Sequence, residues 1–142
     1  MTSETDTAPQ TSNNPANRSA LLIGLDPGLI DFSLPDFDAF PGLTAEKVLA
    51  GFDAAAEGMR ALGYDVYNCL TDFGQTAEET VTAQLRGRHF DCVLIGAGVR
   101  TVPSNLILFE KLINVVHVYA PNSKICFNTK PADTLEALQR WM

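Results

Sequence analysis

The sequence contains two short, uninterrupted apolar runs, and they leave few folds open to it. They are Ala-Leu-Leu-Ile-Gly-Leu at 20–25 and Cys-Val-Leu-Ile at 92–95. Runs of this length that do not alternate with polar residues are typical of strands covered on both faces, as in parallel sheets. Residues 64–70, which partly alternate, and residues 125–128 are predicted as two further strands.

Each predicted strand is followed by a segment whose apolar residues have helical spacing. Thr44 caps the first of these helices and Gly63 ends it, and a capping-box pattern begins a second helix over 76–88. A third helix is predicted over 104–120 and a fourth from Asp133 onward. Strands that alternate with helices predict an α/β fold, in which right-handed crossovers join parallel strands.

The expected fold is a small three-layer sandwich, flavodoxin-like or Rossmann-like, with a four-stranded parallel sheet in the order 2-1-3-4. In that order the winding reverses between the first and third strands, and ligands bind in the crevice at such a point. The crevice would lie between the long connection at 27–43 and the turn at 96–100. Residues 20–142 are expected to form one α/β domain, and the polar residues 1–19 a disordered tail.

Charge and cysteine content limit the classes of partner. The net charge is −7, and residues 26–79 hold eleven acidic residues against two basic ones. The remaining basic residues are scattered, so nucleic acid is not an expected partner. The sequence has neither a membrane-spanning apolar run nor a signal-peptide pattern, which predicts a cytoplasmic protein without a membrane partner. Cys69, Cys92 and Cys126 share no close spacing; we interpret them as buried reduced thiols and expect no metal site.

The turn at 96–100 is the first candidate binding site. We predict that it binds an anion through the backbone amides of its small residues and through the arginine that follows them. The residues are Gly96, Ala97, Gly98, Arg100 and, at the start of the next helix, Ser104. The pattern lacks the third glycine of a dinucleotide fingerprint. The other interpretation is that the two glycines only permit a tight turn and close helix packing.

The connection at 27–43 is far longer than an ordinary strand-to-helix loop. Its three phenylalanines are interleaved with acids, which is typical of a loop packed by its own aromatic residues, and we predict a lid over the crevice. The alternatives are an insertion without function and a segment that covers a subunit contact. If the protein is an enzyme, Asp26 or Asp31 is the candidate acid or base, and Arg100 the electrophilic stabiliser. Because Asp26 precedes a proline, turn formation competes with that role.

The last predicted strand leads into Asn128, Thr129 and Lys130, which are expected to join the same site. Lys130 and the proline after it resemble the end of receiver domains of two-component signalling, in which the lysine contacts a phosphorylated aspartate. Receivers also have an acidic pair after the first strand and an aspartate after the third, whereas here Asp26 stands alone and the third strand ends at Gly96. The resemblance therefore implies at most a degenerate receiver-like platform, and a generic strand-to-helix turn is the alternative.

The predicted helix at 104–120 is apolar around most of its circumference. Glu110, Asn114 and His117 form a single polar stripe. We interpret this stripe as the solvent edge of the helix, or as part of a subunit contact, rather than as a proton relay. The apolar surface around it predicts a homodimer formed through this helix.

Two functions are compatible with the sequence. The first is the binding of a small anionic metabolite or nucleotide at the carboxyl edge of the sheet, with or without catalysis. The second is a non-catalytic, self-associating interaction module. No cofactor is assigned, since the sequence has no Walker loop and no Ser/Thr-rich phosphate loop for a flavin after the first strand.

Overall fold

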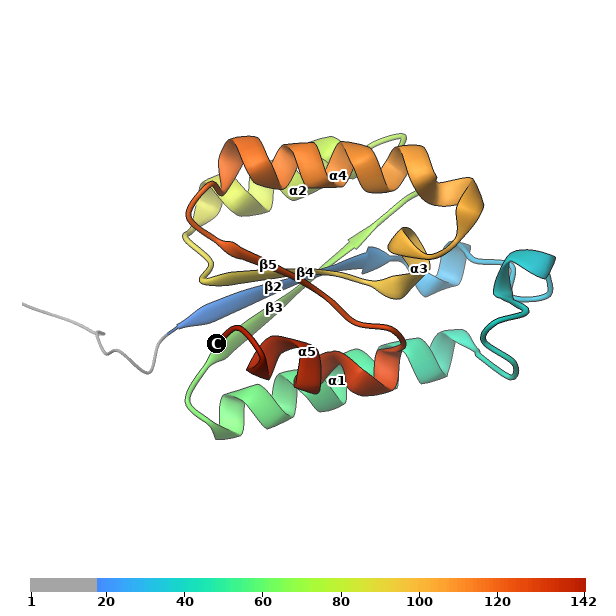
Figure 1. Cartoon of the computed structure of the whole chain (residues 1–142), viewed down its shortest axis with the longest axis horizontal. Coiled ribbons are helices and arrows are strands. Elements are labelled where there is room, and N and C mark those ends of the chain that lie inside the picture. The colour runs from blue at the N-terminus through green and yellow to red at the C-terminus, as the bar shows by residue number, and fades with distance from the viewer. Residues whose placement is uncertain (1–17) are drawn as a thin grey trace, which may run out of the picture.

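The computed structural model describes residues 18–142, and most of the expected tail lies outside this part of the chain. Its centre is one parallel sheet of four strands in the order β3-β2-β4-β5 (Figure 1). This is the predicted order 2-1-3-4, an arrangement shared by flavodoxin-like and Rossmann-like sandwiches. The strands are β2 (Ser19–Leu25), β3 (Asp65–Thr71), β4 (Cys92–Ile95) and β5 (Lys124–Phe127).

Helices cover both faces of this sheet and complete the three layers. One face carries α1 (Ala45–Ala61) and α5 (Thr134–Gln139), and the other carries α2 (Ala77–Gly87) and α4 (Leu106–Tyr119), as Figure 1 shows. A short helix that we did not predict, α3 (Ala97–Arg100), follows β4. Single 3-10 turns occur at Pro27–Leu29, Pro35–Phe37, Pro103–Asn105 and Pro131–Asp133.

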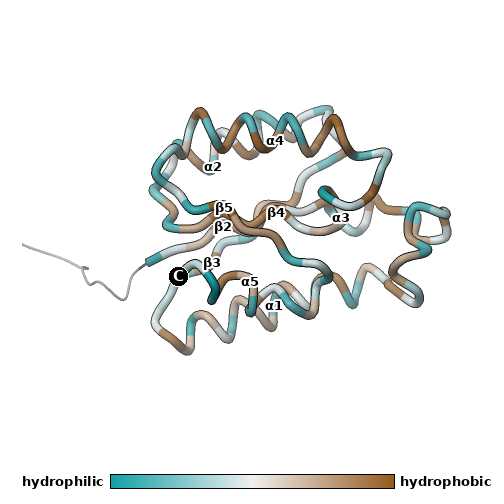
Figure 2. Tube along the Cα trace, in the orientation of Figure 1, coloured by the Kyte–Doolittle hydropathy of each residue, from teal (hydrophilic) through white to brown (hydrophobic). Residues whose placement is uncertain are grey.

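The core consists of two layers of apolar side chains, one on each face of the sheet. Successive residues of a strand point to opposite faces. Leu21 and Ile23 therefore pack in the layer beneath α2 and α4, and Ala20 and Leu22 in the layer beneath α1 and α5. All four are fully buried, and Figure 2 shows the apolar colouring of the central strands.

Glycines bring α1 close to the carboxyl end of the sheet. A Cβ atom at Gly51 would lie 2.6 Å from the Cβ of Pro131 and 2.9 Å from its backbone carbonyl. A Cβ atom at Gly24 would lie 3.0 Å from the ring of Phe52. The first half of α1 therefore contacts both the end of β2 and the segment after β5, at the edge where the winding of the sheet reverses.

Ser19 begins β2 one residue earlier than predicted. Its amide donates a hydrogen bond to the Asp91 carboxylate at 2.9 Å, and its hydroxyl donates to the His89 carbonyl at 3.0 Å. Because these partners are more than sixty residues away, the polar composition around Ser19 gave no local sign that the residue belongs to the sheet.

Candidate functional site

The loop formed by residues 27–43 covers the carboxyl end of the sheet. Within it, Asp31 accepts hydrogen bonds from the amide and the hydroxyl of Ser33, at 3.0 and 2.6 Å. The hydroxyl of Ser104 donates to the Asp36 carboxylate at 2.8 Å and ties the loop to the turn before α4. These hydrogen bonds hold the loop in place over the carboxyl end of the sheet, and its aromatic side chains point toward the interior of the domain.

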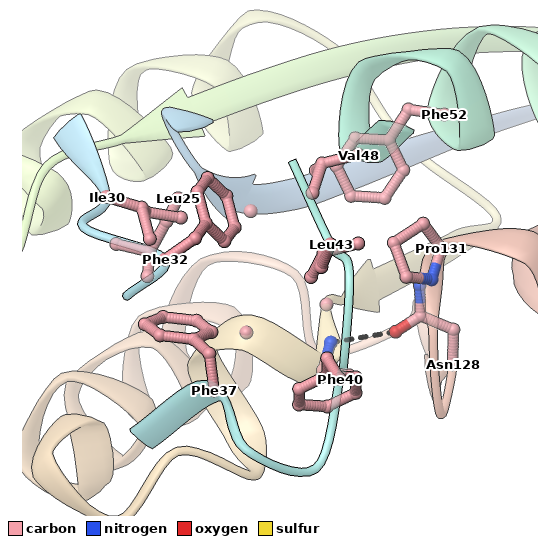
Figure 3. Close-up of a pocket in the computed structure, with 14 residues that line it drawn as sticks. Leu25, Ile30, Phe32, Phe37, Phe40, Leu43, Val48, Phe52, Asn128 and Pro131 are labelled. Carbon is pink, nitrogen blue, oxygen red and sulfur yellow. Dashed lines mark hydrogen bonds between the residues drawn. The ribbon is translucent and has the colours of Figure 1, made fainter. Parts of the chain in front are cut away.

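Beneath this loop lies an enclosed apolar cavity of about 40 Å³ (Figure 3). Phe32, Phe37 and Phe40 line it from the loop, and Val48 and Phe52 line it from α1. The rings of Phe32 and Phe37 pack with their centroids 5.3 Å apart and their planes tilted by 57°. A volume of this size holds about one water molecule. The aromatic side chains therefore close the crevice almost completely.

The floor of the cavity contains four residues that we predicted as a binding site from the sequence. Gly96, Ala97, Gly98 and Asn128 all line it. The Ala97 amide donates to Asn128 Oδ1 at 2.8 Å, and the Gly96 amide donates to the carbonyl of Ile23 at 2.9 Å. The structure thus brings these residues together, but it engages both amides with protein partners.

Asn128 joins the end of β5 to α3 and α5. Only 2% of its surface is exposed. In addition to the Ala97 bond, its Nδ2 donates to Thr134 Oγ1 at 2.9 Å, and its backbone carbonyl accepts from Arg100 Nη2 at 2.9 Å. Since both polar atoms of the side chain are engaged, Asn128 positions the cavity floor.

Arg100 does not line the cavity. Its guanidinium carbon lies 5.4 Å from the centroid of the Phe127 ring. Among residues 18–142, Arg100 Nε is the one buried side-chain nitrogen or oxygen without a hydrogen-bond partner. Arg100 therefore packs on the end of β5. Its guanidinium, which we expected to bind an anion, contacts the Asn128 carbonyl and the Phe127 ring instead.

The two candidate acid–base residues also lie outside the cavity. Asp26 accepts a hydrogen bond from the Gly28 amide at 3.0 Å, as its turn-forming interpretation predicts. Asp31 lines a separate open groove together with Phe73. The hydrogen bonds from Ser33 lower the pKa of Asp31 below its ordinary value, so this carboxyl is ionised at neutral pH. Neither carboxylate offers acid–base chemistry to a molecule in the cavity.

The segment after β5 forms a turn around Asp133. The amides of Thr129 and Lys130 donate to its carboxylate at 3.0 and 3.3 Å, and so does the Thr129 hydroxyl. Burial raises the pKa of Asp133, but these hydrogen bonds outweigh burial and lower the pKa below its ordinary value. The polar groups of Thr129 are thus engaged, whereas the side chain of Lys130 is exposed.

An open groove of about 340 Å³ adjoins the cavity. Lys47 and Lys130 line this lysine groove together with Phe40, Leu43 and Pro131. The last three side chains also line the cavity. They therefore form the wall between a closed aromatic space and an open space that carries two ammonium groups.

Sequence reasoning missed the contribution of α1 to the site. Lys47, Val48 and Phe52 lie in its first two turns and line the groove or the cavity. The signal that could have found them is Thr44, whose hydroxyl accepts from the Lys47 amide at 3.2 Å. Because Thr44 caps α1 directly after the loop at 27–43, the first turns of α1 lie at the same edge of the sheet as that loop.

Cys69, Cys92 and Cys126 are free and buried, as predicted. The Sγ atoms of Cys92 and Cys126 lie 3.3 Å apart, and burial raises the pKa of Cys69 to about 11.

Residues 18–142 contain no group of three or more His, Cys, Asp or Glu side chains arranged to hold a metal ion. In the same range, no helix combines the length and the apolar character needed to cross a membrane.

The outer side of α4 carries the predicted polar stripe. Glu110, Asn114 and His117 are all exposed. Ile107 and Val118 flank the stripe with 61% and 62% of their surface exposed. The apolar surface available for a subunit contact therefore lies toward the two ends of the helix.

The carboxyl edge of the sheet thus combines an enclosed aromatic cavity with an open groove that carries two lysines. Comparison with known proteins gave no match for this chain, either to a protein-family model or to a curated protein.

Proposed function

We propose that this chain binds a small metabolite at the carboxyl edge of its sheet, beneath residues 27–43. The observation that carries the proposal is the cavity there, where side chains of the loop, α1 and the strand ends meet. It lies where the winding of the sheet reverses, the position at which open α/β sheets bind ligands. An apolar, aromatic lining with few polar groups is also typical of small-molecule sites.

Binding requires the loop to move. The enclosed volume is about 40 Å³, whereas sites for drug-sized ligands occupy roughly 300–1,000 Å³. Phe32 and Phe40 are only partly buried, so their rings can leave the cavity without exposing a fully buried surface. The Ser104–Asp36 hydrogen bond that fastens the loop is itself exposed and contributes little to stability. The loop therefore acts as the lid expected from its length.

The proposal is for binding without a chemical step. Asp26, Asp31 and Arg100 line neither the cavity nor the lysine groove. The one polar side chain in the cavity lining is Asn128, which is bonded to Ala97 and Thr134. A bound molecule would thus meet apolar walls and no reacting group.

A thermal-shift screen with two matched variants tests this function. The panel contains nucleotides, sugar phosphates, aliphatic and aromatic carboxylates, neutral aromatics and divalent ions. Gly98 and Gly87 both have no heavy atom within 4 Å of a built Cβ, but Gly98 lines the cavity and Gly87 ends α2. A compound at about a hundred times its Kd should stabilise the wild type by roughly 2.7 kcal/mol, which raises Tm by several degrees.

We expect the shift to be lost in Gly98→Leu, because a large side chain at this lining position leaves less room for a bound molecule, and to persist in Gly87→Leu. A flat panel with the wild type contradicts the proposal. So does a shift of equal size in Gly98→Leu, since the compound would then bind elsewhere.

A second candidate function, self-association as an interaction module, rests on α4. Leu106, Ile107 and Val118 expose 54, 61 and 62% of their surface on this helix. Single exposed apolar residues are ordinary, but several on one helix form a surface that a second copy can cover. This function predicts a dimer whether or not a small molecule binds.

A further inference from the structure

We infer that the ligand is amphipathic, with an apolar body that enters the aromatic cavity and one anionic group that Lys47 and Lys130 hold in the lysine groove. The inference rests on the binding function proposed above and specifies the chemistry of the molecule bound. It also assigns two binding residues, one of which no sequence pattern indicated.

The two lysines reach the groove from distant parts of the chain. Lys47 lies in the first turn of α1, where its Nζ donates to the Gly42 carbonyl at 2.9 Å. Lys130 immediately precedes the Pro131–Asp133 turn. Both side chains are exposed, so an anion can reach them without displacing buried groups.

Neither ammonium group forms an ion pair with a carboxylate of residues 18–142, although the charge of Lys130 helps to lower the pKa of Asp133. Within residues 18–142, the ion pair that involves a lysine is Lys111–Glu78. The groove lining described by the structure contains no Asp or Glu. In a chain of net charge −7, two lysines on one groove, neither of which forms an ion pair, make a local positive site, which favours an anion there over a neutral or cationic group.

The acids on the adjoining segments do not fill this place. The Asp133 carboxylate accepts from the amides of Thr129 and Lys130, at 3.0 and 3.3 Å. Asp31 and Asp36, from the lid, line the other groove. Asp38 and Glu46, the acids next to the groove in the sequence, neither line it nor form an ion pair within residues 18–142. The described carboxylates thus leave free the positions that a ligand's carboxylate would take beside the two lysines.

The wall of the groove determines what the rest of the ligand must be. Phe40, Leu43 and Pro131 line both the groove and the cavity. A molecule whose anionic end lies at the lysines therefore directs its body at this wall, and outward rotation of Phe40 opens the way to Phe32 and Phe52. An apolar body gains stability there by leaving water, whereas a sugar or a second charge would lose its hydration without finding partners.

A nucleotide di- or triphosphate fits this edge less well. Its phosphates need several converging amide donors, as in a glycine-rich loop. Here the amides of Gly96 and Ala97 are bonded to Ile23 and Asn128, at 2.9 and 2.8 Å. Two flexible ammonium groups suit one compact anionic group better than a chain of phosphates.

Three probes with the same body separate the charge from the apolar contact. They are phenylpropionate, phenylpropanol and phenylpropylamine, titrated at low salt into the wild type and followed by amide NMR shifts, with Ala97 and Gly98 as reporters of the cavity. We expect the acid to bind roughly tenfold more tightly than the alcohol, and the amine most weakly. Lys47→Gln and Lys130→Gln should each reduce the advantage of the acid and leave the affinity for the alcohol unchanged.

The matched control is Lys111→Gln, which removes an exposed lysine from α4 and should leave all three affinities unchanged. If the acid and the alcohol bind equally at the cavity, the ligand needs no anionic group and the inference is overturned. The proposed binding function would remain intact. Acetate, which has the carboxylate without the apolar body, is titrated as a comparison. If it binds as tightly as phenylpropionate, the ligand needs no apolar body and the inference is overturned. If no probe moves the cavity reporters, the inference on the ligand is overturned, and the thermal-shift panel separately tests the binding function.

Discussion

Gly51 and Pro131 show how closely α1 approaches the site. A Cβ atom at Gly51 would meet backbone and side-chain atoms of Pro131 at 2.6 to 2.9 Å, and Pro131 lines both the cavity and the lysine groove. Backbone atoms cannot move aside as the end of a flexible side chain can. The absence of a side chain at Gly51 therefore determines how near α1 lies to the segment that carries Lys130.

Alanine at Gly51 should destabilise the protein, whereas alanine at Gly87 should not. Both replacements improve helix propensity by up to about 1 kcal/mol. At Gly51 the added methyl group must push Pro131 away, and overpacking of this kind costs roughly 1–3 kcal/mol. At Gly87 nothing lies within 4 Å of the new Cβ. Urea unfolding of both variants measures the difference, and equal midpoints would contradict the packing described for α1.

Asn128 and Ala97 illustrate which residue-level predictions the sequence supports. Both were expected at the carboxyl edge, and both line the cavity. Their positions at this edge could be predicted because each residue follows the end of a strand, and strand ends are visible in local sequence patterns. Their partnership depends on a distance of 2.8 Å across two strand ends, which is a consequence of register and could not be predicted from either segment alone.

The helix α4 faces the core with one side and solvent with the other. Leu108, Leu112 and Val116 are buried, whereas Ile107 and Val118 are exposed. The apolar pattern of this segment predicted a helix correctly. The pattern could not show how much of the helix surface would be buried. The sheet, α2 and the turn before α4 all contribute to that burial, and they come from different parts of the chain.

If α4 forms a subunit contact, light scattering at micromolar concentration should give the mass of a dimer for the wild type. The variant Ile107→Lys should give the mass of a monomer. A buried unpaired lysine would oppose association by several kcal/mol, as expected for an apolar contact. Leu62→Lys is the control, because Leu62 is exposed by 54% at the end of α1, on the opposite layer. A monomeric wild type, or equal loss of the dimer in the control, would exclude this contact.

Across the whole molecule, several carboxylates stabilise turns at the edges of the sheet. Hydrogen bonds from Ser33 and from Thr76 lower the pKa values of Asp31 and Asp72, and bonds from Thr129 and Lys130 outweigh burial to lower that of Asp133. A carboxyl with a lowered pKa in the folded state stabilises the fold above its unfolded pKa. That contribution is lost as the pH falls through the folded value.

Acid should therefore destabilise the protein below about pH 3.8, the ordinary value for these groups, and Asp133→Asn should reveal one part of the effect. At about pH 7 we expect the variant to lose about 1 kcal/mol of unfolding free energy, since the bonds to a charged group are partly screened by solvent. At about pH 2.5 the difference should be smaller, because the wild-type carboxylate is then protonated in a larger fraction of the molecules. Urea midpoints at the two pH values measure this, and a constant difference would contradict the assigned role of the carboxylate.

The α/β class, the parallel strand order and the edge of the sheet at which the cavity lies could all be predicted from the order of residues. Strand and helix periodicities are local, and right-handed crossovers leave few ways to connect four such units. Which residues line the cavity and the lysine groove depended on how the helices and the loop pack on the sheet. Arg100 packs against Phe127, the loop at 27–43 covers a cavity of about 40 Å³, and Lys47 and Lys130 line one groove. These features join segments that are distant in the sequence, so they arise only when the helices lie on the sheet.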